Sequence, residues 1–146
     1  MSSLRIRVGA ICCENNSLLL VEHEKDNKRY WLLPGGGMQV GETMKDALVR
    51  EVMEETSIEI RVNDLLGVCE SISPDKTRHI VHLLYEVVRI GGEPGVSRDP
   101  RVRRSVFLPI AELDNIMLHP PICGWLKKLL TTDSPRALEY LGALWI

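Results

Sequence analysis

This 146-residue sequence has little of the basic charge typical of nucleic-acid-binding proteins and few of the long apolar runs typical of membrane and secreted proteins. Basic residues are not in excess: 18 Lys and Arg stand against 20 Asp and Glu, whereas a protein that binds a long nucleic acid carries a basic face. No apolar run approaches the roughly 18 residues of a membrane span. The N-terminus, Met1 to Arg7, lacks the apolar core of a secretory signal. We therefore expect a cytoplasmic protein whose partners include neither a membrane nor a nucleic-acid polymer.

Cysteine and aromatic residues are also few. The four cysteines form no C-x-x-C pair and have no finger-type spacing with the histidines, so we interpret them as free thiols in a reducing compartment. Cys12 and Cys13 are adjacent and, on a strand, point to opposite faces. With three Trp, three Tyr and one Phe in the chain, Tyr30, Tyr85 and Phe107 are candidates for stacking on a base, although core packing explains each equally well.

Apolar periodicity predicts a single domain over residues 1–146 with a mixed sheet. Alternating residues predict strands over 4–13, 17–23, 58–62, 65–72, 79–88 and 105–110. The same criterion, with capping signals, predicts helices over 44–56, 110–116 and 122–130, and loops over 24–29, 34–42 and 91–103. This order predicts an α+β fold of the α/β/α sandwich type. The apolar tail, 136–146, should dock on the core or on a partner subunit, which leaves a homodimer open.

The predicted helix over residues 44–56 places three carboxylates on one face. Thr43 is a good N-cap, and Glu54 and Glu55 follow Glu51 by three and four positions, within an arc of roughly 100°. Crowded carboxylates raise one another's pKa unless a cation lies among them, and Mg²⁺ and Mn²⁺ prefer oxygen ligands. Arg50 can neutralise part of the charge. Taken alone, however, the pattern is better interpreted as a solvated acidic face.

Three glycines that precede this helix change the interpretation. Gly35, Gly36 and Gly37 let the backbone approach a phosphate or offer a carbonyl to a metal without side-chain obstruction. They lie just before a helix N-terminus, where anions are favoured. A glycine triplet alone indicates only a flexible turn. Glycines, then Glu42, then three helical carboxylates at fixed spacing form a much rarer combination, which favours a site for phosphate and metal.

Residues 36–58, GGMQVGETMKDALVREVMEETSI, resemble the Nudix box, G-x5-E-x7-R-E-U-x-E-E-x-G-U, where U is apolar. The fixed positions of the box are occupied by Gly36, Glu42, Arg50, Glu51, Val52, Glu54, Glu55 and Ile58. The preceding W-x-x-P-G-G at Trp31 to Gly36 also resembles the family. One position departs from the pattern: Ser57 stands where the family usually has glycine. That position ends the helix, so serine should cost some local stability but removes no ligand.

The resemblance implies roles for these residues. It implies a Mg²⁺ or Mn²⁺ site formed by Gly36, Glu51, Glu54 and Glu55. Arg50 would orient Glu51, and Glu42 would support the loop and the helix. Glu54 is one candidate for activating water, and a loop carboxylate such as Glu93 is the other.

The resemblance also implies an enzyme that hydrolyses the diphosphate linkage of a nucleoside diphosphate joined to a moiety X. The spacing from Ile58 to Pro74 resembles the ADP-ribose pyrophosphatase subgroup, which slightly favours an ADP-ribose-like substrate, although Pro74-Asp75 is equally well explained as a turn. The alternatives are a nucleoside triphosphate pyrophosphohydrolase that sanitises the nucleotide pool and a module that binds a nucleotide without cleaving it. Substrate phosphates are assigned to Arg98, Arg101 and Arg104, for which a solvated face is the other interpretation.

Overall fold

The structure is a computed structural model that describes residues 3–133 and 135–145. Its elements are, in order, β1 (Ser3–Ile11), β2 (Cys13–Glu14), β3 (Ser17–Lys25), β4 (Lys28–Leu32), β5 (Gly35–Gly37), α1 (Met44–Thr56), β6 (Glu59–Ile72), β7 (Arg78–Gly91), β8 (Val102–Pro109), the 3₁₀ helix η1 (Ile110–Asn115), α2 (Cys123–Thr131) and β9 (Glu139–Leu144). In this described part of the chain, no helix is both long and apolar enough to cross a membrane.

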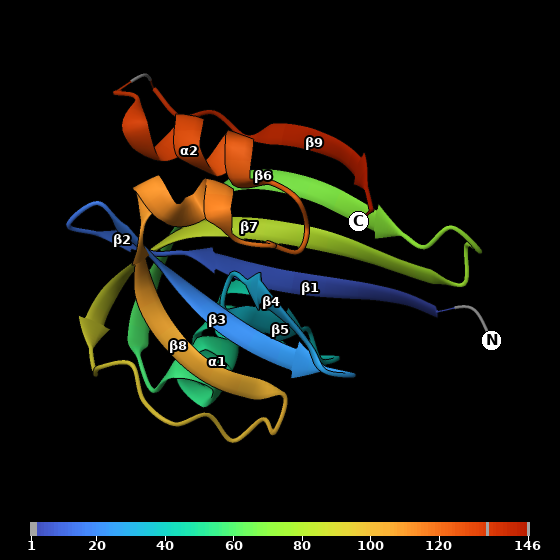
Figure 1. Cartoon of the computed structure of the whole chain (residues 1–146), viewed down its shortest axis with the longest axis horizontal. Helices are drawn as coiled ribbons and strands as arrows, with labels where there is room; N and C mark the ends of the chain where they lie inside the picture. Colours follow the sequence, from blue (N-terminus) through green and yellow to red (C-terminus); the bar gives the residue numbers. More distant parts are fainter. Residues whose placement is uncertain (1–2, 134, 146) are drawn as a thin grey trace.

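The strands form two sheets between two helical layers (Figure 1). The larger sheet has the order β5-β1-β7-β6-β9 and is mixed, because β1 pairs with β7 and β6 with β9 in parallel while the other pairs are antiparallel. The smaller sheet places β3 between β4 and β8. The helix α1 packs on one side, and α2 with η1 packs on the other. The predicted α+β sandwich is confirmed.

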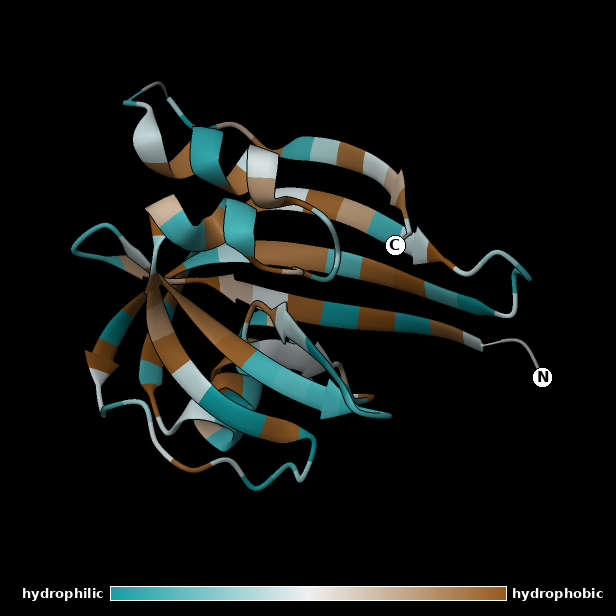
Figure 2. Ribbon diagram, viewed as in Figure 1, coloured by the Kyte–Doolittle hydropathy of each residue, from teal (hydrophilic) through white to brown (hydrophobic). Residues whose placement is uncertain are grey.

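Each helical layer covers its own apolar cluster. Brown and teal residues alternate along the first half of β1, as expected of a strand whose two faces differ in polarity (Figure 2). The strand β3 is apolar on both faces: Leu18 and Leu20 join the cluster under α2, and Leu19 joins the cluster under α1. Leu18, Leu19 and Leu20 are fully buried, so this continuous apolar run is the shared centre of the sandwich.

Three short segments differ from the sequence prediction. The glycines predicted as loop form the edge strand β5, paired with β1. The predicted loop 24–29 shrinks to a two-residue turn at Asp26-Asn27, both at positive φ, because β3 and β4 extend to meet it. The strands predicted over 58–62 and 65–72 are one strand, β6, whose register shifts between Val62 and Leu65. Asn63 and Asp64, the polar residues between the two predicted strands, lie in a bulge and do not end the strand.

The tail docks on the sheet. Its strand β9 adds in parallel to the edge of β6, and Leu141 and Leu144 pack against the cluster under α2, so docking of these residues on the core is confirmed. Leu138 and Tyr140 stay exposed on this edge. Ile146, which belongs to the predicted tail, lies outside the described residues. The homodimer stays a prediction.

The helix α1 begins and ends as its sequence predicts. Thr43 is the N-cap, and its side chain accepts a hydrogen bond of 3.1 Å from the Asp46 backbone N–H. At the other end Ser57 is left-handed, with φ 64° and ψ 18°, and its N–H donates to the Met53 carbonyl. This is the conformation in which glycine is favoured and in which a Cβ atom crowds the backbone.

We predict that Ser57→Gly stabilises the protein. Removing the Cβ atom relieves the left-handed crowding, and this gain exceeds the added flexibility of the unfolded chain, so the free energy of unfolding should rise by about 0.5 to 1 kcal/mol. The measurement is urea denaturation. The control is Ser57→Ala, which keeps the Cβ atom and should gain nothing. Equal effects of the two substitutions would contradict the backbone explanation.

A buried histidine couples stability to pH. His82 on β7 is 5% exposed, and its Nε2 lies 3.0 Å from Ser71 Oγ. Burial, and secondarily the positive charge of Arg7, lower the pKa of His82 to about 4. The folded protein therefore holds this ring neutral at a pH where the unfolded chain, with a histidine pKa of about 6.5, already binds a proton.

The free energy of unfolding should therefore fall as the pH decreases from about 6.5 to about 4, with His82 contributing up to about 3 kcal/mol. Chemical denaturation at a series of pH values measures this slope. His82→Gln keeps a polar partner for Ser71 but cannot titrate, so it should flatten the slope over this interval. If wild type and variant lose stability in parallel, another group is responsible.

Candidate functional site

The edge strand β5 lies directly against the carboxylates of α1 and requires glycine there. A Cβ atom added to Gly36 would lie 2.3 Å from the carboxyl carbon of Glu51. A Cβ atom added to Gly35 would lie 1.9 Å from the Val8 carbonyl oxygen on β1. Gly36 therefore lets the backbone approach the Glu51 carboxylate more closely than any side chain permits, and Gly35 does the same for the pairing of β5 with β1. This explains why a strand of three glycines borders the acidic face of α1.

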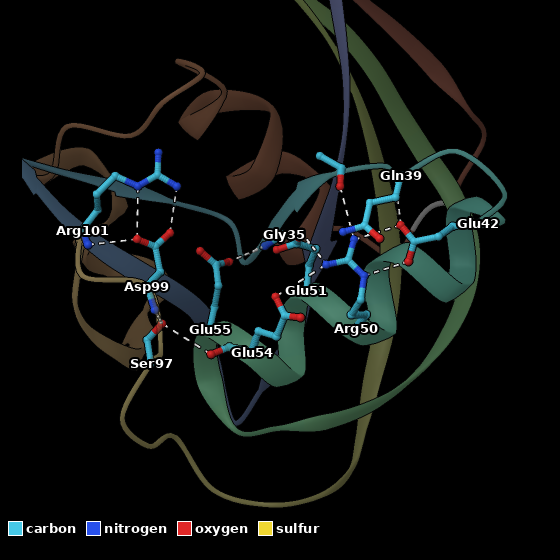
Figure 3. A network of polar contacts seen from close by, with 11 residues as sticks. Gly35, Gln39, Glu42, Arg50, Glu51, Glu54, Glu55, Ser97, Asp99 and Arg101 are labelled. Atoms are coloured by element: carbon cyan, nitrogen blue, oxygen red, sulfur yellow. Dashed lines mark hydrogen bonds and ion pairs between the residues drawn. The ribbon is translucent and has the colours of Figure 1, made fainter.

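Arg50 lies at the centre of the acidic cluster (Figure 3). Its Nε donates to Glu42 Oε2 at 2.7 Å, and its Nη2 donates to Glu42 Oε1 at 2.9 Å. Its Nη1 donates to Glu51 Oε1 at 2.9 Å and lies 3.5 Å from Glu54 Oε2. These contacts raise the pKa of Arg50 and lower the pKa of Glu42. Arg50 therefore joins the loop before α1 to two carboxylates of the helix.

Among the three glutamates of α1, Glu51 and Glu55 are more enclosed than Glu54. Glu55 is buried, and its Oε1 accepts a 2.7 Å hydrogen bond from the Gly35 N–H. Burial raises the pKa of Glu51, an effect that its contact with Arg50 opposes. Glu55 Oε2 lies 3.5 Å from His23 Nε2, a buried ring nitrogen without a hydrogen-bond partner. His23 thus adds an imidazole from β3 that the sequence analysis did not assign to the site.

The loop between β7 and β8 closes over the C-terminal end of α1. The Gly95 N–H donates to the Thr56 carbonyl, and the Ser97 hydroxyl and the Arg98 N–H reach the Glu54 carbonyl at 3.4 Å. The Asp99 N–H donates to Ser97 Oγ, and Figure 3 shows the Asp99 carboxylate between Arg101 and Glu55. The loop therefore carries a further carboxylate, Asp99, and its partner Arg101 is also attracted by the charge of Glu55.

The sequence prediction names Glu93 as the loop carboxylate and does not include Asp99. In the structure Glu93 pairs with Arg89 Nη1 at 2.9 Å, and its side chain is 84% exposed. Asp99 pairs with Arg101 at 2.8 Å, which lowers the pKa of Asp99. No spacing rule in the sequence distinguishes the two, because only the folded loop decides which carboxylate faces α1.

The three arginines predicted to bind phosphates are not brought together. Arg98 contacts α1 through its backbone, and Arg101 is held by Asp99. Arg104 lies on β8, where its Nε donates to Glu22 Oε1 at 3.1 Å and its guanidinium lies 5.2 Å from the centre of the Trp31 ring. Trp31 belongs to the cluster under α2. Arg104 therefore faces away from the α1 layer.

The acidic cluster is chemically suited to a divalent cation. Within the part of the chain described, no three His, Cys, Asp or Glu side chains stand ready to enclose a metal ion. The reason lies in their present partners: Arg50 holds Glu42 and Glu51, and the Gly35 N–H holds Glu55. One guanidinium nevertheless contacts three carboxylates, so negative charge is in excess. Oxygen donors with excess negative charge match the preference of Mg²⁺ and Mn²⁺.

Comparisons with known proteins agree with this geometry. The sequence profile of the NUDIX domain family matches residues 3–131. A solved structure of a MutT NUDIX hydrolase from Burkholderia pseudomallei superposes with a TM-score of 0.75 and 25% identity, covering 89% of this chain and all of that one.

Several relatives carry functional names, and three of them cover the range of named substrates. An ADP-ribose pyrophosphatase of Methanocaldococcus jannaschii is 36% identical over 89 residues, which are 60% of this chain and 53% of that protein, so the match spans about half of the relative. An 8-oxo-dGTP diphosphatase of Escherichia coli is 38% identical over a match that covers 64% of this chain and 73% of that protein. The human diphosphoinositol polyphosphate phosphohydrolase 3-alpha is 36% identical over a match that covers 88% of this chain and 80% of that protein.

We predict that Gly36→Ala displaces the Glu51 carboxylate without unfolding the protein. The new methyl group would meet the mobile end of a side chain, which can move, whereas a clash with backbone could not be relieved. Binding of Mn²⁺, measured by calorimetry, should weaken by about 10-fold or more. The control is Gly124→Ala on α2, where an added Cβ meets nothing within 4 Å. Unchanged Mn²⁺ affinity in Gly36→Ala would separate this carboxylate from metal binding.

Proposed function

The chain belongs to the NUDIX domain family, and we propose that it is a divalent-metal-dependent hydrolase of a diphosphate linkage in a small nucleotide substrate. The observation that carries the proposal is the set of three carboxylates on α1 beside the glycines of β5: Glu51 and Glu54 contact Arg50, and Glu55 accepts from the Gly35 N–H. The names of the three relatives support it, since ADP-ribose, 8-oxo-dGTP and a diphosphoinositol polyphosphate all contain a phosphoanhydride (P–O–P) linkage.

The metal would be held by Glu51, Glu54 and Glu55, with a backbone carbonyl at Gly36 as a further oxygen donor. When bound, Mg²⁺ or Mn²⁺ neutralises the diphosphate oxygens and lowers the pKa of a water molecule. Arg50 balances the cluster and fixes Glu51 through their 2.9 Å contact. Glu42 holds Arg50 from the loop side with two hydrogen bonds and thereby positions the helix face.

Two carboxylates are our candidates for handling the attacking water. The Glu54 side chain is 48% exposed and so is accessible to water, which suits the role of general base. Arg101 lowers the pKa of Asp99, which makes Asp99 a permanently charged acceptor and a weak base. We assign proton abstraction to Glu54 and orientation of the water to Asp99. Glu93, the loop carboxylate that the sequence offers as a base, pairs with Arg89 at 2.9 Å and remains the alternative to Glu54.

An ADP-ribose-like substrate remains the slightly favoured choice, and it is supported by the relative of that name. Pro74, the sequence feature behind this choice, lies in the turn between β6 and β7, where the Lys76 N–H donates to the Ser73 carbonyl. A turn role thus accounts for Pro74 by itself. A nucleoside triphosphate is the second candidate, supported by the 8-oxo-dGTP diphosphatase relative.

A nucleotide-binding module without activity is the third candidate. It would gain nothing from crowding three carboxylates, a cost that burial of Glu51 and Glu55 increases. A protein that only bound the anionic substrate would also be better served by neutral side chains at these positions. The acidic cluster therefore favours the hydrolase.

The test is phosphate release, after treatment with a phosphatase, from ADP-ribose, nucleoside triphosphates, dinucleoside polyphosphates and nucleotide sugars in Mg²⁺ or Mn²⁺. We expect metal-dependent turnover of at least one class. Glu51→Gln and Glu54→Gln should each reduce kcat by about 100-fold or more, because each removes a charge that acts at the reacting centre. The control is Glu139→Gln, an exposed glutamate on β9. Nucleotide binding without turnover would overturn the hydrolase and favour the binding module.

A further inference from the structure

The helix α1 ends at a residue whose side chain costs free energy. Ser57 is left-handed, with φ 64°, and its side chain is only partly exposed. A serine in this conformation is crowded by its own Cβ atom, and such strain persists where the surrounding structure holds the residue in place. The contacts that Ser57 makes with the rest of the chain therefore indicate what its side chain does.

The loop between β7 and β8 packs directly on this end of α1 (Figure 1). A Cβ atom added to Gly95 would lie 3.1 Å from Ser57 Oγ and 3.2 Å from Ser57 Cβ, so the serine side chain fills the space beside the loop backbone. Gly92, at φ 80°, is closer still, because a Cβ atom there would lie 2.3 Å from the Ser57 carbonyl oxygen. Two glycines of the loop thus receive one residue of the helix end.

Hydrogen bonds hold the loop in the same place. The Gly95 N–H donates to the Thr56 carbonyl at 2.9 Å, and the Ser97 hydroxyl and the Arg98 N–H each reach the Glu54 carbonyl at 3.4 Å. The last carbonyl groups of a helix have no partner within the helix. The loop therefore supplies donors to the end of the helix that carries the acidic cluster.

A short series of contacts continues from this end of α1 to a charged pair. The Ser97 hydroxyl also accepts a 3.0 Å hydrogen bond from the Asp99 N–H. Asp99 in turn pairs with Arg101 at 2.8 Å, and the charge of Glu55 attracts Arg101. A displacement of the loop from α1 would therefore move Asp99 and Arg101 together.

We infer that Ser57 is a positioning residue, which sets the distance of the β7–β8 loop from α1 and thereby the place of the loop carboxylates relative to Glu54. The inference deepens the proposed function and rests on it. Glu93 and Asp99 both belong to this loop, so the role of Ser57 is the same whichever of them acts on the water. Ser57 acts through the loop backbone and is assigned no contact with metal or substrate.

This role separates activity from stability. Ser57→Gly relieves the left-handed crowding, so the variant should be more stable, but it also empties the space beside Gly95. Catalysis is sensitive to misplacement of a reacting group by about 1 Å, so kcat should fall by about 10-fold while KM changes by less than about twofold. Ser57→Ala keeps the Cβ atom that the loop packs on, and its loss should be only about twofold. A serine with only a structural role would leave the more stable variant at least as active as wild type.

A substitution in the loop tests the same contact from the other side. Gly95 is not among the glycines at positive φ, so its backbone tolerates alanine. Gly95→Ala places a methyl group against Ser57 and should lower kcat by about 10-fold. In Ser57→Gly/Gly95→Ala the methyl group fills the space that the serine vacates, so kcat should return to within about threefold of wild type. The control is Gly124→Ala on α2, and additive losses in the double variant would overturn the inference.

Amide hydrogen exchange, followed by NMR, supplies a readout independent of turnover. Exchange of the Gly95 and Arg98 N–H groups, which donate to α1, should be about 10-fold faster in each single variant and return to the wild-type rate in the double variant. If exchange follows this pattern but no nucleotide is hydrolysed, positioning of the loop by Ser57 is supported and the hydrolase fails. If hydrolysis depends on Glu51 while Ser57→Gly matches wild type in kcat, the positioning role is overturned.

Discussion

The contacts of Arg50 are the interaction on which the site depends. Without a cation among them, Glu42, Glu51 and Glu54 would repel one another and could not share one end of the sandwich. A guanidinium with several donors in a fixed plane can satisfy three carboxylates from one position, which a lysine could not. Arg50 therefore does more than balance charge. It fixes the loop before α1 to the helix face and holds Glu42, Glu51 and Glu54 in a defined arrangement.

The edge strand β5 imposes the second constraint. Its glycines allow Glu51 to approach from one face and Arg5 from the other, at distances where a Cβ atom could not fit. The Gly35 N–H, left free of the ladder, holds the buried Glu55 carboxylate. This three-residue strand therefore lies between the Glu51 carboxylate on one face and the Arg5 guanidinium on the other.

Much of the fold and part of the site could be predicted from the sequence. The helix over residues 44–56, its Thr43 cap and the strained Ser57 end follow from local signals that act within one or two turns. The contact between Arg50 and Glu51 also follows, since both lie on one short helical segment. The predictions failed where pairing is long-range: β5 has too few residues for a strand signal, and the continuity of β6 depends on its partner β7.

The sequence by itself determined the family, the acidic face of α1 and the glycines beside it, because these are properties of one contiguous segment with fixed helical and turn geometry. Only the tertiary structure decided which residues from elsewhere in the chain meet that segment. The fold paired Glu93 with Arg89 and Asp99 with Arg101, brought His23 to within 3.5 Å of Glu55, and turned Arg104 away from the α1 layer. Those choices depend on the path of a loop and on which face of a strand a side chain occupies. Sheet pairing and packing fix both, and neither leaves a local signal in the sequence.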